Sequence, residues 1–404
     1  MLAVSRTLFR LCRSRRRAIL VVLAALAAVE PALPQPPQAS QQPAQASQPS
    51  GFDQLSAQAA AARDAGDLPR AASLYTQALR LNPSWQDGWW YLGQLRYGAN
   101  NYSEAIDAFT HYLDLVPNAA PATALRGLCE FELGRFEPSL RDVQHALALG
   151  AADDSRNTQI LRYHEALLLT RLGRFEEALA SFSWFAKQHL SDDQMLLGVG
   201  LATLHLPLLP AEATSEQREE ASAAGNAAFL LMSGDKQGAA QAFQQFFAHY
   251  PAVENVHYSY GYLLYPTDPD AAIVEFRREV EVDPASSVTH TMLAWALLID
   301  NEPADALPEA RKAVAEAPQL PLAQLTLGRA LLETGDVKAS LPVLASALAL
   351  DPQNLEVHIA LARAYSESGR AEDARRERLA CLQMTDHSAK PAPAMGQQEE
   401  PSGK

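Results

Sequence analysis

The chain has few of the residues from which catalytic and metal sites are usually built. It contains 3 cysteines and 10 histidines among 404 residues, and most of the histidines are scattered. The pair His164-Glu165 lacks the second histidine of a helical zinc-protease motif, and Gly198-Val199-Gly200 lacks the third glycine of a dinucleotide-binding loop. We therefore predict no catalytic residue, no cofactor and no metal, and we expect that the protein is not an enzyme.

Clusters of lysine and arginine with interleaved aromatic residues are also missing after residue 27. The formal net charge is -14, and an acidic surface of this kind repels phosphate backbones. Nucleic acid is therefore not among the partners that we expect.

Residues 1–27 have the pattern of a secretory signal peptide. Basic residues precede an apolar run from Ala18 to Ala27, whose last three residues offer small side chains for cleavage. The run is shorter than the roughly 20 residues that span a bilayer. We expect an exported protein, periplasmic or secreted. An uncleaved anchor in the inner membrane is the alternative, and only in that case do we expect contact with a membrane.

Two segments show no apolar periodicity. Residues 28–51 are rich in proline and glutamine, and residues 385–404 are rich in proline, glycine, glutamine and glutamate. Both compositions predict disorder, the first as a linker and the second as a tail.

The most informative stretch runs from Trp89 to Pro117. Apolar residues at helical spacing continue to Tyr97, a break follows at residues 98–101, and a second amphipathic run from Glu104 to Leu115 ends before the proline. This pattern predicts a helical hairpin. Its bulky side chains cannot be buried by one hairpin alone, so stacked neighbours are required.

Residue types at fixed offsets in this stretch resemble the tetratricopeptide repeat. The matching residues are Trp89, Leu92, Gly93, Ala105, Phe109 and Pro117, while Arg96 stands where the family usually has tyrosine. The 34-residue period recurs, because Pro83 and Pro117 are one period apart and a later proline ladder has steps of 33, 34 and 34 residues. That ladder consists of Pro251, Pro284, Pro318 and Pro352.

The resemblance implies an all-α, right-handed superhelical solenoid of about nine hairpins. Residues 52–191 would form repeats 1–4, and residues 220–384 would form repeats 5–9. Between them, residues 192–219 break the period, and we expect an irregular helix and loop that joins two sub-arrays. Cys129 and Cys381 would lie in distant repeats, too far apart for a disulfide, and we expect both to be small buried residues.

In this family, peptides usually lie in a concave groove lined by the first helix of each repeat. Its lining residues stand at positions two, five, nine, twelve and thirteen of that helix, which we call the groove positions. Here the residues predicted at these positions are Trp90, Gln94, Tyr97, Leu128, Phe131, Tyr163, Leu167, Tyr258, Tyr262, Tyr265, Trp295, Arg329 and Arg363. Most are aromatic or aliphatic, which favours a protein or peptide partner held by apolar contacts.

Three histidines share the fourth position of the first helix in their repeats, namely His257, His290 and His358. One interpretation is a ladder of metal ligands. The other is that each histidine replaces the packing tryptophan of the motif at a position that faces the core.

The resemblance thus predicts an exported scaffold or adaptor in the cell envelope that binds protein through an apolar, aromatic-lined groove. One alternative is a chaperone-like factor for the assembly of pili or outer-membrane proteins. The other is an enzyme or glycan-binding protein with its site in residues 192–219. The sequence specifies neither the partner nor the oligomeric state.

Overall fold

A computed structural model describes residues 51–150 and 156–389, and within these residues the regular structure is entirely α-helical. The predicted signal peptide, most of the linker and the end of the tail lie outside the described residues. Among the described helices, none combines the length and apolarity needed to cross a bilayer.

The chain divides into two compact units, here called unit 1 (Met1–Pro251) and unit 2 (Ala252–Lys404). The helices described in unit 1 are α3 (Gly51–Asp64), α4 (Leu68–Leu81), α5 (Gln86–Gly98), α6 (Tyr102–Leu115), α7 (Ala120–Glu132), α8 (Phe136–Ala148), α9 (Arg156–Arg171), α10 (Phe175–Lys187), α11 (Asp193–Thr203), α12 (Ser215–Met232) and α13 (Lys236–His249). Those in unit 2 are α14 (Val256–Leu264), α15 (Pro269–Val282), α16 (Ser287–Ile299), α17 (Pro303–Glu316), α18 (Pro321–Glu333), α19 (Val337–Leu350), α20 (Leu355–Glu367) and α21 (Ala371–Ala389).

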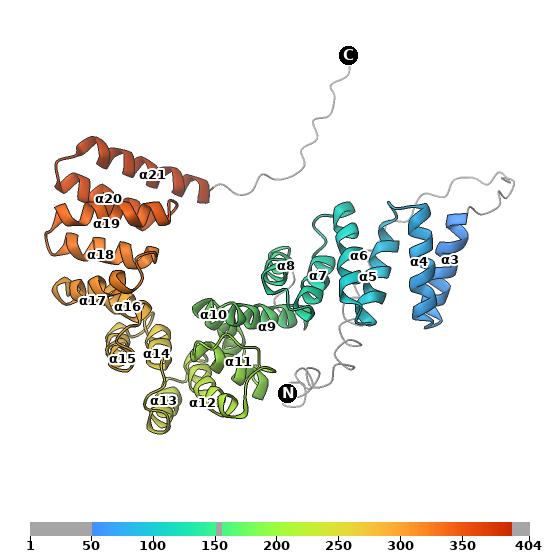
Figure 1. Ribbon diagram of the computed structural model, residues 1–404, viewed down its shortest axis with the longest axis horizontal. Helices are drawn as coiled ribbons and strands as arrows, with labels where there is room; N and C mark the ends of the chain where they lie inside the picture. Colours follow the sequence, from blue (N-terminus) through green and yellow to red (C-terminus); the bar gives the residue numbers. More distant parts are fainter. Residues whose placement is uncertain (1–50, 151–155, 390–404) are drawn as a thin grey trace, which may run out of the picture. The chain divides into compact units, whose positions relative to one another are not determined.

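Each helix packs mainly against the helices that precede and follow it in the chain. In unit 2 the pairs α16 and α17, α18 and α19, and α20 and α21 are hairpins that stack in sequence order (Figure 1). This is the expected architecture of stacked helical hairpins, and every repeat core is completed by its neighbour.

The turn between α18 and α19 has the same left-handed residue position as the turn between α16 and α17. Gly335 between α18 and α19 has a φ of 86°, and Asn301 occupies the same place between α16 and α17 with a φ of 61°. Glycine and asparagine are the residues that adopt this left-handed conformation at least cost. Helix α19 then begins after Asp336, whose carboxylate accepts a hydrogen bond from the Ala339 N–H.

The core of a hairpin is fitted by complementary side-chain volumes. Phe109 of α6 is fully buried, and it fills the space left by Gly93 of α5. In the hairpin of α16 and α17, alanines stand at both corresponding places, Ala294 and Ala310, and both are fully buried. A large residue in the second helix therefore accompanies a glycine in the first, and two small residues accompany each other.

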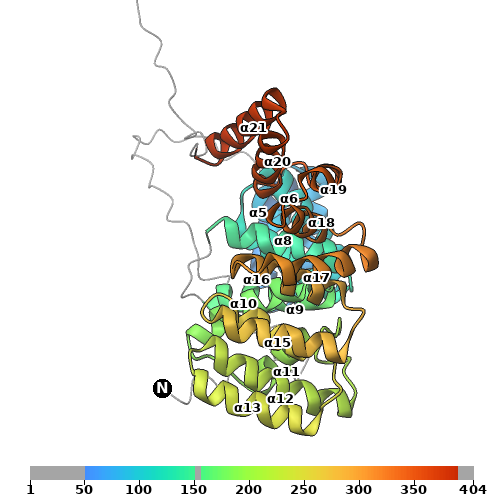
Figure 2. The ribbon, with the colours of Figure 1, turned by 90° about the vertical axis from the view of Figure 1, so that its left-hand side faces the viewer.

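Residues 192–219 form a regular helix, a loop and the beginning of the next helix, α12. Helix α11 begins after Asp192, whose carboxylate accepts hydrogen bonds from two backbone N–H groups, and it ends at Thr203, before Pro207. It packs side by side with α12, and α12 packs on α13 (Figure 2). Because Thr214 and Gln217 form a reciprocal capping box, α12 starts at Ser215 rather than near Glu220.

The chain end and the cysteines also differ in detail from expectation. Helix α21 continues to Ala389, past residue 385, where the tail was predicted to begin. Cys129 is fully buried as predicted, and burial raises the pKa of its thiol. Cys381 is half-buried, and both of these thiols are free.

Candidate protein-binding surface

Five of the predicted groove residues of unit 1 are buried inside the unit. They are Gln94, Tyr97, Leu128, Tyr163 and Leu167. Tyr97 and Leu128 belong to one hydrophobic cluster formed by α5, α6 and α7, and burial raises the pKa of the Tyr97 phenol. These side chains contribute to the packing within and between the repeats.

The other two predicted residues of unit 1 are half-buried and rest on neighbouring rings. Trp90 packs against Tyr112 with their ring centres 5.5 Å apart, and Phe131 meets His164 edge to face at 4.9 Å. Each keeps part of its ring at the surface, so these two residues could contribute to a binding surface in unit 1.

The predicted groove residues of unit 2 are more open. Tyr258 is buried against Phe276 of α15, but Tyr262, Tyr265, Trp295 and Arg329 are half-buried and Arg363 is exposed. They come from α14 with its C-cap residue Tyr265, and from α16, α18 and α20, the first helices of four consecutive hairpins. Of these helices, α16 contacts α18 and α18 contacts α20.

Three of these residues form a connected cluster. The guanidinium carbon of Arg329 lies 4.5 Å from the centre of the Trp295 ring, and Trp295 is hydrogen-bonded to the hydroxyl of Tyr265. Burial raises the pKa of Tyr265, while the hydrogen bond and the positive charge of Arg329 act in the opposite direction. The contacts hold the three side chains in one arrangement across α14, α16 and α18.

Sequence reasoning missed four exposed aliphatic residues on the same helices. Val288, Ile299, Leu322 and Ile359 expose 39%, 54%, 37% and 47% of their surface. Val288 and Leu322 stand at groove position two, Ile299 at thirteen and Ile359 at five. The position rule that gave Trp295 and Arg329 could therefore have found them. Together with Tyr262, Tyr265, Trp295, Arg329 and Arg363 they define what we call the first-helix row of unit 2.

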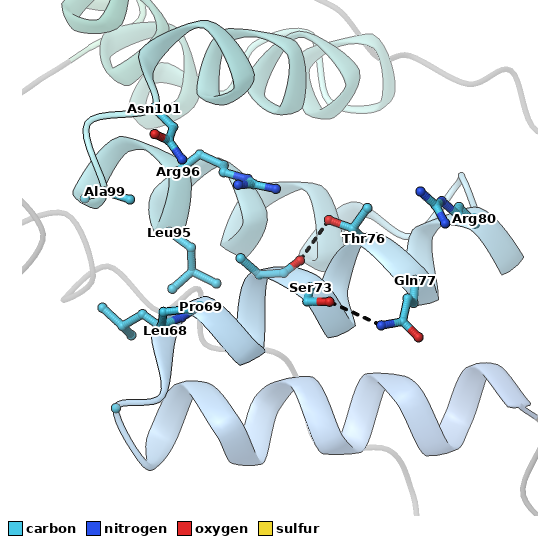
Figure 3. Close-up of a pocket in the computed structure, with 13 residues that line it drawn as sticks. Leu68, Pro69, Ser73, Thr76, Gln77, Arg80, Leu95, Arg96, Ala99 and Asn101 are labelled. Atoms are coloured by element: carbon cyan, nitrogen blue, oxygen red, sulfur yellow. Dashed lines mark hydrogen bonds between the residues drawn. The ribbon is translucent and has the colours of Figure 1, made fainter.

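An open pocket of about 910 Å³ lies in unit 1 between α4 and the end of α5 (Figure 3). Its wall includes Leu68 and Leu95 and two basic residues, Arg80 and Arg96. Arg96 is paired with Glu104 at 2.8 Å. No sequence pattern predicts this pocket, because its wall combines the outer side of one helix with the turn of the next hairpin.

Comparison with family models agrees with this repeat architecture. One model described as a tetratricopeptide repeat matches residues 56–120, 92–155 and 163–227, and a second with the same description matches residues 333–377. Together these matches cover just over half of the chain. The chain belongs to the tetratricopeptide repeat family.

Solved structures with tetratricopeptide-like folds resemble parts of the chain. A crystal structure of MamA is 18% identical, with a TM-score of 0.37, over 40% of this chain and 96% of that one. A MamA structure from Desulfovibrio magneticus RS-1 is 18% identical, with a TM-score of 0.39, over 43% and 98% of the two chains. At this level the likeness concerns the fold alone. No curated protein matches the chain.

The aligned histidines of the tetratricopeptide repeats form hydrogen-bonded pairs with glutamates of the second helix. The Nδ1 to Oε2 distances are 2.7 Å for His257 and Glu275, 2.6 Å for His290 and Glu309, and 2.7 Å for His358 and Glu377. We call these pairs the His–Glu dyads. The histidines could be located from their shared position in the repeat, whereas their glutamate partners were not predicted.

The second ring nitrogen is also engaged in two dyads. His290 Nε2 donates to the Pro284 carbonyl at 2.9 Å, and His358 Nε2 donates to the Pro352 carbonyl at 3.2 Å. Trp89 and Gln324 stand at the same fourth position of their repeats. Their side chains donate hydrogen bonds to the carbonyl oxygens of Pro83 and Pro318, at 2.8 and 2.9 Å. These contacts fit the interpretation that each histidine replaces the packing tryptophan of the motif. They do not fit a ladder of metal ligands, because both ring nitrogens of His290 and of His358 are already hydrogen-bonded.

Proposed function

We propose that the chain is an exported scaffold that binds a protein partner through the first-helix row of unit 2. Tetratricopeptide repeats support a role in protein–protein interaction. The observation that carries the choice of surface is the exposure of Val288, Ile299, Leu322 and Ile359 on first helices. In this family these positions line the groove, and apolar side chains exposed there favour an interaction site.

Aromatic and arginine side chains strengthen this assignment. Trp295 and Arg329 lie on α16 and α18, and tryptophan, tyrosine and arginine contribute much of the binding energy in protein interfaces. Their mutual contacts restrain them before a partner arrives, which reduces the entropy lost on binding. A segment laid across α14, α16, α18 and α20 would meet them in turn.

The test is a crosslinking pull-down with two triple variants. In the first, Ile299→Ser, Leu322→Ser and Ile359→Ser remove exposed aliphatic groups of the row. In the matched control, Leu81→Ser, Val274→Ser and Leu382→Ser remove leucine and valine side chains that are 59%, 45% and 62% exposed on second helices. We expect the first variant to lose its specific partner and the control to keep it. Equal capture by both variants with unchanged helicity would contradict the proposal.

Export is a separate part of the proposal, and it rests on the arginines and apolar run of residues 1–27. Cell fractionation and amino-terminal sequencing of the native protein would test it. We expect a mature chain beginning near residue 28 outside the cytoplasm. Recovery of a chain that starts at Met1 in the cytosolic fraction would exclude this part and leave the binding surface in place.

A further inference from the structure

The charges along the first-helix row are unequally balanced. Arg363 of α20 donates to Glu367 at 2.8 Å and to Glu333 of α18 at 3.2 Å, so its charge is compensated twice. Glu333 stands one helical turn from Arg329 on the same helix but is directed to Arg363 instead. Among the described residues, Arg329 has no carboxylate partner, and its guanidinium lies over the Trp295 ring instead. It is the uncompensated cation of the row.

The contact with the Trp295 ring determines which part of the Arg329 guanidinium is available to bind a ligand. A guanidinium that lies over an aromatic ring uses its flat face for that contact. Its N–H donors point outward in the plane of the group, where they can form two parallel hydrogen bonds with one carboxylate. The half-buried position lowers the local dielectric constant and strengthens such a contact relative to one in open water.

Exposed apolar residues also stand at groove positions of the two helices that carry Arg329 and Trp295. Leu322 lies on the helix of Arg329 and Ile299 on α16, and both are exposed at groove positions. A nucleic acid or an anionic lipid surface would bring many negative charges toward a chain of net charge -14. A protein segment that carries a single acid between apolar residues avoids this repulsion.

We propose that the first-helix row of unit 2 recognises a protein segment with one glutamate or aspartate flanked by apolar side chains, and that Arg329 on the Trp295 platform binds its carboxylate. This inference rests on the proposed function of the same row. Helices in contact lie about 8–10 Å apart, and an extended chain rises about 3.3 Å per residue. The apolar residues of the segment should therefore stand about three positions before and after the acid.

The experiment uses the full chain and two labelled synthetic peptides, each with serine and glycine at its ends. One has the core Leu-Ala-Ala-Glu-Ala-Ala-Leu, and the other has glutamine in place of glutamate. Fluorescence anisotropy measures both affinities for the wild type, for R329Q and for R311Q. The last is the matched control, because Arg311 lies exposed on the second helix α17. R329K keeps the charge without the planar fork and decides the result if R329Q is misfolded.

We expect the wild type and R311Q to bind the glutamate peptide about tenfold more tightly than the glutamine peptide, as a net gain near 1.4 kcal/mol requires. R329Q should bind both peptides equally, and R329K should retain part of the preference. If the wild type binds the two peptides equally, or binds neither of them, the inference about Arg329 is overturned. The proposed function is left standing in both cases. A glutamate preference that persists in R329Q would also overturn the inference. Binding unaffected by the Ile299, Leu322 and Ile359 serine variant would instead exclude the row as the binding surface.

Discussion

The separation of α11 and α12 depends on two glycines. A Cβ built on Gly200 would lie 1.6 Å from the carbonyl oxygen of Ala221, and one built on Gly225 would lie 1.9 Å from the carbonyl oxygen of Leu196. In both cases the obstacle is backbone, which cannot rotate away as a side chain can. These two positions therefore allow no side chain unless the helices move apart.

Gly200→Ala should destabilise unit 1 more than Gly198→Ala does. Both changes raise helix propensity equally, by about 1 kcal/mol, but a Cβ at Gly198 meets only side-chain atoms, the Phe182 ring at 3.0 Å and Leu167 Cδ2 at 3.4 Å. We expect the free energy of unfolding of G200A to be lower than that of G198A by at least about 2 kcal/mol. Thermal and urea unfolding followed by circular dichroism would measure it. Equal stabilities would mean that the helices separate at little cost.

His205 makes unit 1 sensitive to acid. Its ring stacks on Phe175 at 4.4 Å, and burial lowers its pKa to about 4. The unfolded chain binds a proton at this residue below about pH 6.5 and the folded unit does not, so stability should fall as the pH drops from about 6.5 to 4. The loss from this group is up to about 3 kcal/mol, and it levels off below pH 4.

His205→Phe should reduce this acid sensitivity, because phenylalanine keeps a ring against Phe175 and does not titrate. The measurement is the unfolding midpoint in urea at pH 7 and at pH 4.5 for both proteins. We expect the difference between the two pH values to be smaller in H205F. An unchanged difference would assign the acid sensitivity to other groups.

At the scale of the element, a His–Glu dyad links the two helices of a hairpin, and the dyads of His290 and His358 also tie the first helix to the turn before it. In the dyad of α16 and α17, a carbonyl oxygen can only accept, so the hydrogen on His290 Nε2 points to Pro284. The contact between Nδ1 and Glu309 therefore needs a proton as well, carried by the imidazole or by the carboxyl group. The hairpin of α18 and α19 has Gln324 and Val343 at the corresponding positions, so it makes the turn contact without a dyad.

Replacing one member of a dyad should cost more than replacing both. Glu309→Val leaves a nitrogen of the fully buried His290 without its partner, at a cost of about 1–3 kcal/mol. The double variant His290→Gln, Glu309→Val reproduces the pair found in the next hairpin and should recover part of that loss. Thermal unfolding of the two single variants and the double variant forms the mutant cycle. Additive losses would show that the two residues are not coupled.

Much of the helical architecture could be predicted because its signals are local. The prolines from Pro251 to Pro352 and the turn glycines can be recognised in short stretches of the sequence. The burial of Tyr97 and Leu128 could not be predicted, since the groove positions specify a helix face and not how closely the next hairpin covers it. The dyad glutamates were missed for a similar reason, because each stands 18 or 19 residues after its histidine on another helix.

At the scale of the whole molecule, a perturbation should stay within the unit that contains it. The chain divides at Pro251 and Ala252, and every helix packs mainly on its chain neighbours, so coupling passes from one hairpin to the next. Long repeat arrays lose all-or-none cooperativity for this reason.

Hydrogen exchange measured by mass spectrometry can test this locality. In G200A we expect faster exchange of backbone amides in α11 and in the helices that contact it, α9, α10 and α12, and unchanged exchange in α16 through α21. The physical reason is that opening α11 removes contacts only from its neighbours. Faster exchange throughout unit 2 would indicate that the chain unfolds as one cooperative block.

The exchange of a His–Glu dyad for glutamine and valine in a single hairpin has a consequence for how such chains diverge. A hairpin that loses only its glutamate, or only its histidine, passes through a less stable form, so the two changes should be inherited together. In sequences descended from a common ancestor, the two positions should therefore vary as a pair within one hairpin and independently between hairpins. Each repeat would then carry its own record of the exchange.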